Sequence, residues 1–304
     1  MSMLETLGVL AHRGGLIARH PELTVGVVAA YARPTGLELE LLARRPPDPR
    51  GAEQRQADIR AGRTGPPPAE RRLLPPFDEG LDLRAGWLDD TGRAHWEFGS
   101  LESSGDYAGF RLRTRLLFPL RYPHVSVALA WPEIGFPETV VDLALPDRAT
   151  VERGTVSIWD APHHASDPPA GLRHRDAHEI LDEPHIETGR IVAAPRVLHR
   201  DRGAAVVLTR VTAVGELLSL EVVSVATRAV PSEWGASIAV LHGREAIGLG
   251  PNAASAAGGA QAFRSTAGFT VRRPDDDVLG LLVSWPAAGL PEALATVPLS
   301  RPGP

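Results

Sequence analysis

Short runs of alternating apolar and polar residues recur along the chain, and clusters of glycine, proline and aspartate separate them. In residues 37–41, which read LELEL, leucine and glutamate alternate strictly. A period of two places the leucines on one face of a strand and the glutamates on the other, which predicts a half-buried antiparallel strand. The turn sequence RPTG at residues 33–36 predicts a hairpin between this strand and the apolar run at residues 23–32.

An internal repeat is the most specific feature of the sequence. Residues 125–145 and 279–299 share the pattern W-P-x-x-G-[FL]-P-E, with apolar runs on both sides, at an offset of 285 − 131 = 154. Residues 37–42 resemble residues 218–223 (LSLEVV) at an offset of 218 − 37 = 181. The difference, 181 − 154 = 27, predicts about 27 additional residues in the first copy, and the Pro/Arg-rich residues 44–77 have the composition of such a surface insertion.

Each copy contains six or seven short predicted strands in about 110 residues, which is typical of a β-sandwich. The predicted fold class is all-β: two tandem, internally duplicated antiparallel β-sandwich domains of the immunoglobulin-like kind, joined by a loop-rich linker. We expect copy one at residues 1–146 with its insertion at 44–77, a histidine-rich linker at 147–202 with a short helix at about 176–181, and copy two at 203–304. The strands of copy two are expected at residues 204–213, 217–227, 237–242, 263–272, 278–285 and 292–299.

We expect the W-P-x-x-G-x-P-E turn, called the W-P turn below, to have a structural role. Trp131 and Trp285 would each close one end of a core, because an indole buries a large area. The prolines that follow would end the preceding strands, because proline has no backbone donor. The alternative interpretation is that the turn glutamates, Glu138 and Glu292, are equivalent contact points for a partner.

The predicted linker contains six of the eleven histidines. His174 and His178 would lie one turn apart on a helix, and such a pair can bind a divalent metal with Asp176 or Glu179 as a further ligand. The sequence HRDAHE lacks the glutamate that follows the first histidine of H-E-x-x-H. The favoured interpretation is therefore a solvent-exposed linker with a short helix, and the metal site is the alternative.

Arginines make the insertion basic. Arg44, Arg45, Arg71 and Arg72 lie near its two ends, on either side of a proline-rich middle. These side chains could dock an acidic surface of a partner or a phosphate-bearing polymer. The alternative is a surface excursion of one hairpin without a binding role.

Composition excludes several kinds of chemistry. The chain has no cysteine, and all 32 basic residues are arginine, so disulfides, thiolate nucleophiles and lysine Schiff bases are excluded. The net charge is −5 and most arginines are dispersed, so we expect no nucleic-acid partner. Residues 1–20 do not read as a signal peptide and no apolar run is long enough to span a bilayer, so we expect a cytoplasmic protein without a membrane partner.

No cofactor motif is present, and we expect no cofactor. The glycine-rich residues 248–261 lack the following helix that a phosphate-binding loop needs, so they are predicted to form a flexible loop.

Two parts of the sequence resemble a group of uncharacterised actinobacterial tandem β-sandwich proteins. The first is the pattern Y-x-x-P-T-G-L-E-L, which here begins at Tyr31 and ends at Leu39, and the second is the W-P turn at residues 131–139. The resemblance covers most of copy one and the W-P turn of copy two, which lacks the Y-x-x-P-T-G turn. It implies a fold and supplies no activity.

We predict a non-enzymatic binding or assembly protein that acts through its sandwich edges, insertion and linker, on an unknown protein partner or by self-association. One alternative is a metal-dependent hydrolase that uses the linker histidines. Another is a carbohydrate- or ligand-binding module, in which Trp87, Trp96 or Trp234 would form an aromatic platform.

Overall fold

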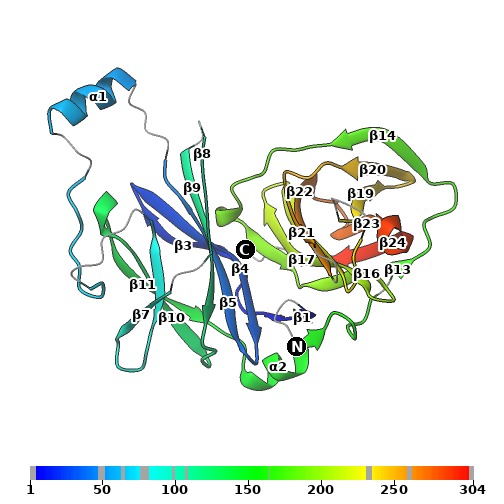
Figure 1. Ribbon diagram of the computed structural model, residues 1–304, viewed down its shortest axis with the longest axis horizontal. Coiled ribbons are helices and arrows are strands. Elements are labelled where there is room, and N and C mark those ends of the chain that lie inside the picture. The colour runs from blue at the N-terminus through cyan, green and yellow to red at the C-terminus, as the bar shows by residue number, and fades with distance from the viewer. Residues whose placement is uncertain are drawn as a thin grey trace.

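Two β-sandwiches lie side by side in the computed structural model of the chain (Figure 1). The structure describes residues 5–46, 52–62, 66–75, 82–97, 100–106, 109–163, 165–230, 235–258 and 262–300. We call the sandwich built from strands β2 to β11 sandwich one, and the sandwich built from strands β13 to β24 sandwich two. Among the described residues, no helix is long and apolar enough to cross a lipid bilayer.

Sandwich one consists of two antiparallel sheets. The first has the strand order β2-β4-β5-β9-β8, with β3 also paired to β4, and the second has the order β11-β10-β6-β7. The strands of the first sheet are β2 (Val9–Leu10), β3 (Gly15–His20), β4 (Leu23–Arg33), β5 (Gly36–Arg44), β8 (Ser100–Asp106) and β9 (Gly109–Phe118). Those of the second sheet are β6 (Arg84–Leu88), β7 (Ala94–Glu97), β10 (His124–Trp131) and β11 (Phe136–Ala144).

Sandwich two repeats this plan. Its first sheet has the order β15-β17-β18-β22-β21, with β16 also paired to β17, and its second has the order β13-β24-β23-β19-β20-β14. The strands of the first sheet are β15 (Arg190–Ala193), β16 (Arg196–Asp201), β17 (Ala204–Val214), β18 (Leu217–Ala226), β21 (Ala253–Gly258) and β22 (Phe263–Arg272). Those of the second sheet are β13 (Ala165–Ser166), β14 (Arg173–Glu179), β19 (Ser237–His242), β20 (Glu245–Leu249), β23 (Val278–Trp285) and β24 (Leu290–Pro298).

The strand order of both sandwiches is that of the immunoglobulin fold. When β4 to β11 receive the letters A, B, C, C′, D, E, F and G in chain order, the sheets of sandwich one read A-B-E-D and G-F-C-C′. Strands β17 to β24, lettered in the same way, give the same two sheets in sandwich two. The predicted fold class, two immunoglobulin-like antiparallel β-sandwiches in tandem, is confirmed.

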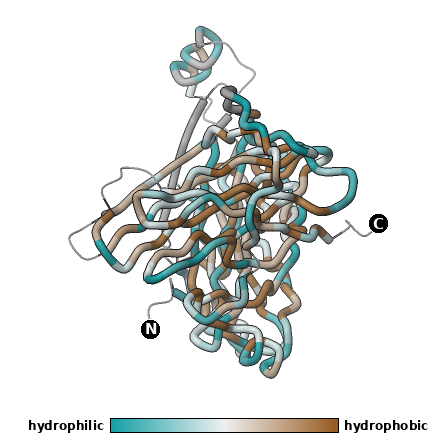
Figure 2. Tube along the Cα trace, turned by 90° about the vertical axis from the view of Figure 1, so that its right-hand side faces the viewer, coloured by the Kyte–Doolittle hydropathy of each residue, from teal (hydrophilic) through white to brown (hydrophobic). Residues whose placement is uncertain are grey.

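Apolar alternation accounts for the two cores. Leu37, Leu39 and Leu41 of β5 point into sandwich one and are completely buried. The side chains of each sandwich form one apolar cluster between its sheets, and Figure 2 shows the hydrophobic stretches running along the strands. Burial of one leucine side chain contributes about 1.5–3 kcal/mol, so these clusters stabilise both sandwiches without disulfides.

The two W-P turns have the same conformation. Trp131 and Trp285 have φ/ψ angles of −149°/66° and −145°/69°, and each precedes a 3-10 turn, η2 (Pro132–Ile134) or η4 (Pro286–Ala288). Both turns end at a glycine with a φ near +80°, a conformation that a Cβ disfavours. Each indole is buried against a phenylalanine of strand E: Phe110 at 6.0 Å and Phe263 at 5.5 Å between ring centroids. This agrees with the structural role that the sequence predicts.

Much of the predicted linker is part of sandwich two. Strands β13, β14, β15 and β16 all extend its sheets. The short helix predicted at about residues 176–181 is wrong, because residues 173–179 form β14, which pairs in parallel with the edge of β20. The sequence RHRDAHE has no apolar stripe that a helix could bury, whereas an open sheet edge satisfies its backbone groups.

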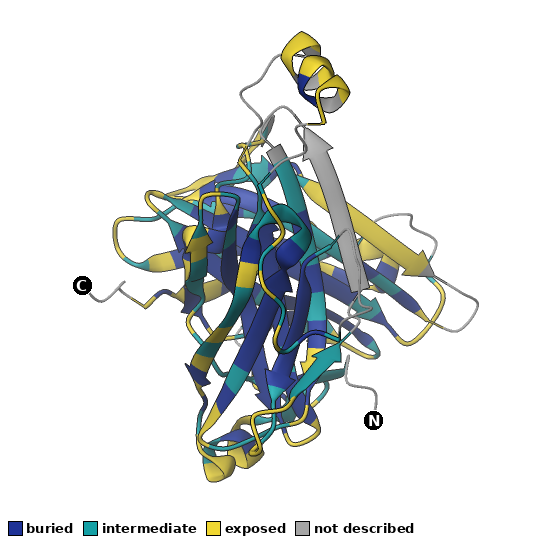
Figure 3. Ribbon diagram, turned by 90° about the vertical axis from the view of Figure 1, so that its left-hand side faces the viewer, coloured by how far each residue is buried: buried dark blue, intermediate teal, exposed yellow. Residues whose placement is uncertain are grey.

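Helices are few and short. Helix α2 (Arg148–Gly154) begins after Asp147, whose carboxylate accepts a hydrogen bond from the backbone N–H of Thr150 at 2.8 Å. Another 3-10 turn, η3 (Ile186–Thr188), precedes β15, and β1 (Thr6–Leu7) pairs with β12 (Val156–Ser157). Helix α1 (Ala52–Arg60) lies in the predicted insertion and projects away from sandwich one, with a largely exposed surface (Figures 1 and 3).

The glycine-rich run predicted as a flexible loop contains a strand. Residues 253–258 form β21, which pairs with β22 along its whole length. Small side chains do not prevent this pairing, because the ladder uses backbone groups alone.

Candidate functional site

The A-B-E-D sheets of the two sandwiches face each other, and polar side chains join them. Arg113 of β9 donates a hydrogen bond to Glu221 of β18 at 2.8 Å, and Arg210 of β17 donates one to Glu40 of β5 at 3.3 Å. The hydroxyl of Tyr31 on β4 donates to the backbone oxygen of Thr209 at 2.5 Å. The two sandwiches are therefore joined by specific hydrogen bonds as well as by the chain.

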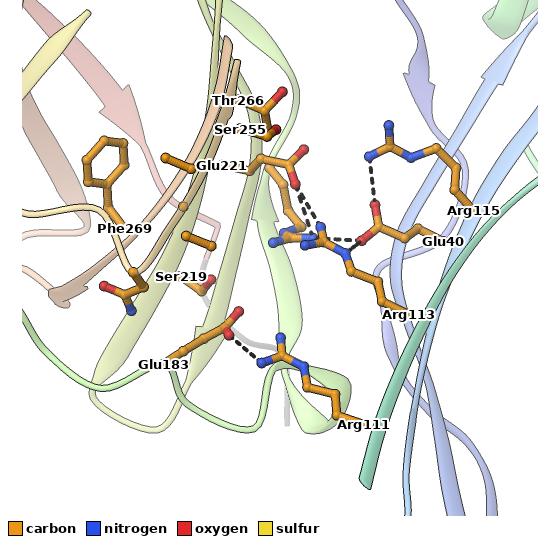
Figure 4. A pocket seen from close by; sticks show the side chains of 15 residues that line it. Glu40, Arg111, Arg113, Arg115, Glu183, Ser219, Glu221, Ser255, Thr266 and Phe269 are labelled. Atoms are coloured by element: carbon orange, nitrogen blue, oxygen red, sulfur yellow. Dashed lines mark hydrogen bonds and ion pairs between the residues drawn. The ribbon is translucent and has the colours of Figure 1, made fainter. Parts of the chain in front are cut away.

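Five charged residues at the centre of this interface form what we call the interface charge cluster: Glu40, Arg113, Arg115, Arg210 and Glu221. Figure 4 labels all of them except Arg210. Arg113 donates to Glu40 as well as to Glu221, and Arg115 donates to Glu40 at 3.2 Å. The side chains of Glu40 and Arg210 are only 2% and 3% exposed. Charges so deeply buried are stable only when they are paired, and each of these two has at least one partner of opposite charge.

The two glutamates of the cluster are held in the ionised form. Burial alone would raise the pKa of Glu221, but the guanidinium groups of Arg210, Arg113 and Arg115 and the hydrogen bond from Thr209 together outweigh burial and lower the pKa to about 2. For Glu40, burial is likewise outweighed by Arg113, Arg210 and Arg115 together, and its pKa lies below the ordinary value. A carboxylate that stays ionised at neutral pH is a poor proton donor, so the cluster suits charge recognition better than general acid catalysis.

Apolar contacts flank the charged centre on two sides. Val28 and Leu42, on the outer face of sandwich one, pack against Ile186 of η3. Leu7 and Ile158 pack with Val197 of β16 and Val207 of β17. The interface thus combines a charged centre with buried apolar margins.

A cavity of about 450 Å³ lies beside the interface charge cluster, between the two A-B-E-D sheets (Figure 4). Arg111, Arg113 and Arg115, which alternate along β9, line one side of it. Residues of β18, β21 and β22 line the other side, and Glu183 contributes a carboxylate that pairs with Arg111 at 2.6 Å. The volume lies within the range of small-molecule sites in proteins.

The predicted contact glutamate of sandwich one holds the insertion. Glu138 accepts hydrogen bonds from three successive backbone N–H groups, those of Arg72, Leu73 and Leu74, at 2.7–2.8 Å. Trp96 of β7 donates its indole N–H to the oxygen of Leu73 at 3.2 Å. The carboxylate of Glu138 therefore anchors residues 72–74 against the W-P turn.

The equivalent glutamate of sandwich two, Glu292, contacts a residue of the predicted linker. The carboxylate of Glu292 lies 3.4 Å from Nε2 of His174 on β14. Both turn glutamates thus hold a segment of their own chain, and the sequence pattern alone did not indicate which segment.

The four predicted contact arginines also have partners within the chain. Arg44 donates to the buried Glu187 at 2.7 Å, and the guanidinium of Arg45 lies 5.6 Å from the ring centroid of Trp131. Arg71 and Arg72 pair with Glu133 and Glu70, respectively.

The structure does not assemble the predicted metal site. His174 and Glu179 lie on β14, where side chains are spread along the extended strand instead of gathering on one helical face. The side chains of Asp176 and His178 lie outside the described residues. In the described parts of the chain, no group of three or more His, Asp or Glu side chains could hold a metal ion.

Two of the three tryptophans proposed for an aromatic platform are described. Trp87 is buried, with His95 stacked on it at 4.3 Å and Arg121 at 4.4 Å from its ring. Trp96 is half-buried and binds Leu73, as described above. Trp234 lies outside the described residues. Trp87 therefore offers no open face to a sugar.

The outer edges of the two G strands differ. In sandwich two, the edge of β24 is covered by β13, with Ala165 opposite Ala295 and Ser166 opposite Leu294. In sandwich one, β11 is the last strand of its sheet, and no strand in the described ranges pairs with its outer edge. The side chain of Val140 on β11 is 45% exposed.

Comparisons with known proteins add little. No protein-family model and no curated protein matches the chain. Among solved structures, the crystal structure of bovine butyrophilin is similar over 88% of this chain and 93% of that chain, with 12% sequence identity and a TM-score of 0.22. A TM-score this low carries no argument, so the fold assignment rests on the strand order of the two sandwiches.

Proposed function

We propose that this chain is a non-enzymatic binding and assembly protein that self-associates through the outer edge of β11. The observation that carries the proposal is the difference between the two G strands: β24 is covered by a strand of its own chain, and β11 is not covered in the described residues. An open edge presents a row of backbone donors and acceptors that can pair with another strand.

Sandwich two indicates where pairing would occur. At the repeat offset of 154, Leu294 and Ala295 correspond to Val140 and Val141. In sandwich two these positions pair with β13 in the antiparallel direction. The two G strands pair with their F strands in equivalent registers, so the edge of β11 offers the same geometry to an incoming strand.

The sequence of β11 suits pairing with a second copy of itself. When Val141 lies opposite the partner's Val141, the inward faces of both strands stay on the same side of the joined sheet. Val140 then lies opposite the partner's Asp142, and Thr139 opposite the partner's Leu143. Centring the pair on Val140 instead would place Glu138 opposite the partner's Asp142, and like charges in that position are destabilising.

A charge substitution tests both the edge and the register. Val140→Asp places a carboxylate opposite the partner's Asp142 at two symmetric positions, whereas Val140→Arg places a guanidinium there. We expect the wild-type chain to dimerise in sedimentation equilibrium at up to roughly 100 µM, Val140→Asp to weaken the dimer about tenfold, and Val140→Arg to preserve it. Val278→Asp, on an exposed valine of β23, is the matched control and should leave association unchanged.

Two results would reject self-association through β11. One is a wild-type chain that stays monomeric over the whole concentration range, even if its β11 edge pairs with an extended segment of another protein. The other is a dimer to which Val140→Asp and Val278→Asp make no difference.

A further inference from the structure

We infer that the cavity between the two A-B-E-D sheets binds a small polycarboxylate. This inference is independent of the proposed self-association, because the cavity lies on the opposite sheet of sandwich one from β11. It rests on the charge of the cavity wall, the spacing of its arginines and the size of the cavity.

The charge of the cavity wall is positive. Four arginines and three glutamates line it, which gives a net charge of 4 − 3 = +1: Arg111, Arg113, Arg115, Arg210, Glu40, Glu183 and Glu221. Because the wall is partly shielded from water, this excess charge is less screened than it would be on an open surface. An anion is the ligand that compensates it.

The arginines are arranged to bind a carboxylate. Arg111, Arg113 and Arg115 occupy alternate positions of β9, so their side chains leave the same face of the sheet, about 7 Å apart at each step. Figure 4 shows the three side chains extending from sandwich one toward sandwich two. A guanidinium group offers a planar pair of donors that matches the two oxygens of a carboxylate.

The volume of the cavity sets a lower bound on the size of a ligand that fills it. A cavity of about 450 Å³ exceeds what an inorganic anion fills and accommodates an organic acid of four to six carbons. We therefore use L-malate and citrate as probes and inorganic phosphate as the size control.

Isothermal titration with the full chain tests the site through two substitutions of opposite effect. Arg111→Gln removes a donor from the wall and should weaken the binding of L-malate or citrate about tenfold. Glu183→Gln removes the carboxylate that competes for Arg111 and raises the net charge of the wall, so binding should become severalfold tighter. Arg148→Gln makes the same charge change as Arg111→Gln on an exposed arginine of α2 and should have no effect.

The two substitutions are expected to change the affinity in opposite directions, and misfolding cannot explain both results because a misfolded variant cannot bind more tightly. The inference is overturned if neither acid binds the wild-type chain at roughly 10 mM, which corresponds to a binding free energy weaker than about 3 kcal/mol. It is also overturned if phosphate binds as well as the acids do, or if Arg111→Gln and Arg148→Gln have the same effect.

Discussion

Glu40→Gln replaces a buried carboxylate by a neutral amide of nearly the same shape. In the wild-type chain this carboxylate pairs with Arg113, with Arg115 at 3.2 Å and with Arg210 at 3.3 Å. The interface charge cluster contains three arginines and two glutamates, so the substitution changes its net charge from +1 to +2. The additional positive charge is buried, because the side chain of Arg210 is only 3% exposed and water cannot solvate it.

The expected cost follows from that burial. Removing one partner of a buried ion pair typically costs about 3–5 kcal/mol, because the remaining charge stays buried without compensation. Glu38→Gln is the matched control: it lies two residues away on β5 and pairs with Arg33 at 2.6 Å and Arg115 at 3.4 Å, but it is more exposed. For this more solvated carboxylate we expect a cost below about 1 kcal/mol.

Urea denaturation followed by tryptophan fluorescence measures both costs. Two sandwiches can unfold in separate steps, so the free energy is taken from the first transition. The double variant Glu40→Gln/Arg210→Gln returns the cluster to +1 and should recover part of the loss. The reasoning is refuted if Glu40→Gln and Glu38→Gln lower the free energy of unfolding equally, or if the second substitution adds to the loss.

Two further predictions use the same contacts. The pKa of Glu221 is lowered from 4.5 to about 2, so its ionised form stabilises the fold by roughly 3 kcal/mol above pH 4.5. This contribution should disappear as the pH falls from 4.5 to 2. Urea midpoints measured across that range should therefore fall more steeply in the wild type than in Glu221→Gln. Glu138→Gln replaces a carboxylate that accepts hydrogen bonds from three backbone N–H groups by an amide with one acceptor oxygen. Trypsin should therefore cut after Arg71 or Arg72 faster in this variant than in Glu292→Gln. Equal rates of cleavage at these two sites in the two variants would contradict the anchoring role.

Elements with a strong apolar pattern were predictable from the sequence. The expected strands at residues 237–242, 263–272 and 278–285 coincide with β19, β22 and β23. Alternating burial fixes such strands locally, so no knowledge of the partner strand is needed. The two W-P turns were equally predictable, because proline and glycine restrict the backbone in a known way.

Elements that depend on a template were not predictable. The sequences of β14 and β21 lack an apolar alternation, and they become strands because the edges of β20 and β22 offer unpaired backbone groups. The interface charge cluster was missed for a related reason. Glu40 was assigned to the outer face of its strand, but its partners Arg113 and Arg210 are 73 and 170 residues away, and no local pattern connects them.

The repeat also explains why the interface needs arginines from different strands. Glu40 and Glu221 occupy the same position of strand B, at the repeat offset of 181, so duplication alone would bring two like charges together. Each is neutralised by neighbours that the other copy lacks. Arg115 lies opposite Glu40 on strand E, where sandwich two has Gly268 opposite Glu221. Arg210 lies opposite Glu221 on strand A, where sandwich one has Ala29 opposite Glu40. The two sandwiches are therefore complementary instead of interchangeable, because Arg210 of sandwich two binds Glu40 across the interface and Arg113 of sandwich one binds Glu221 in return.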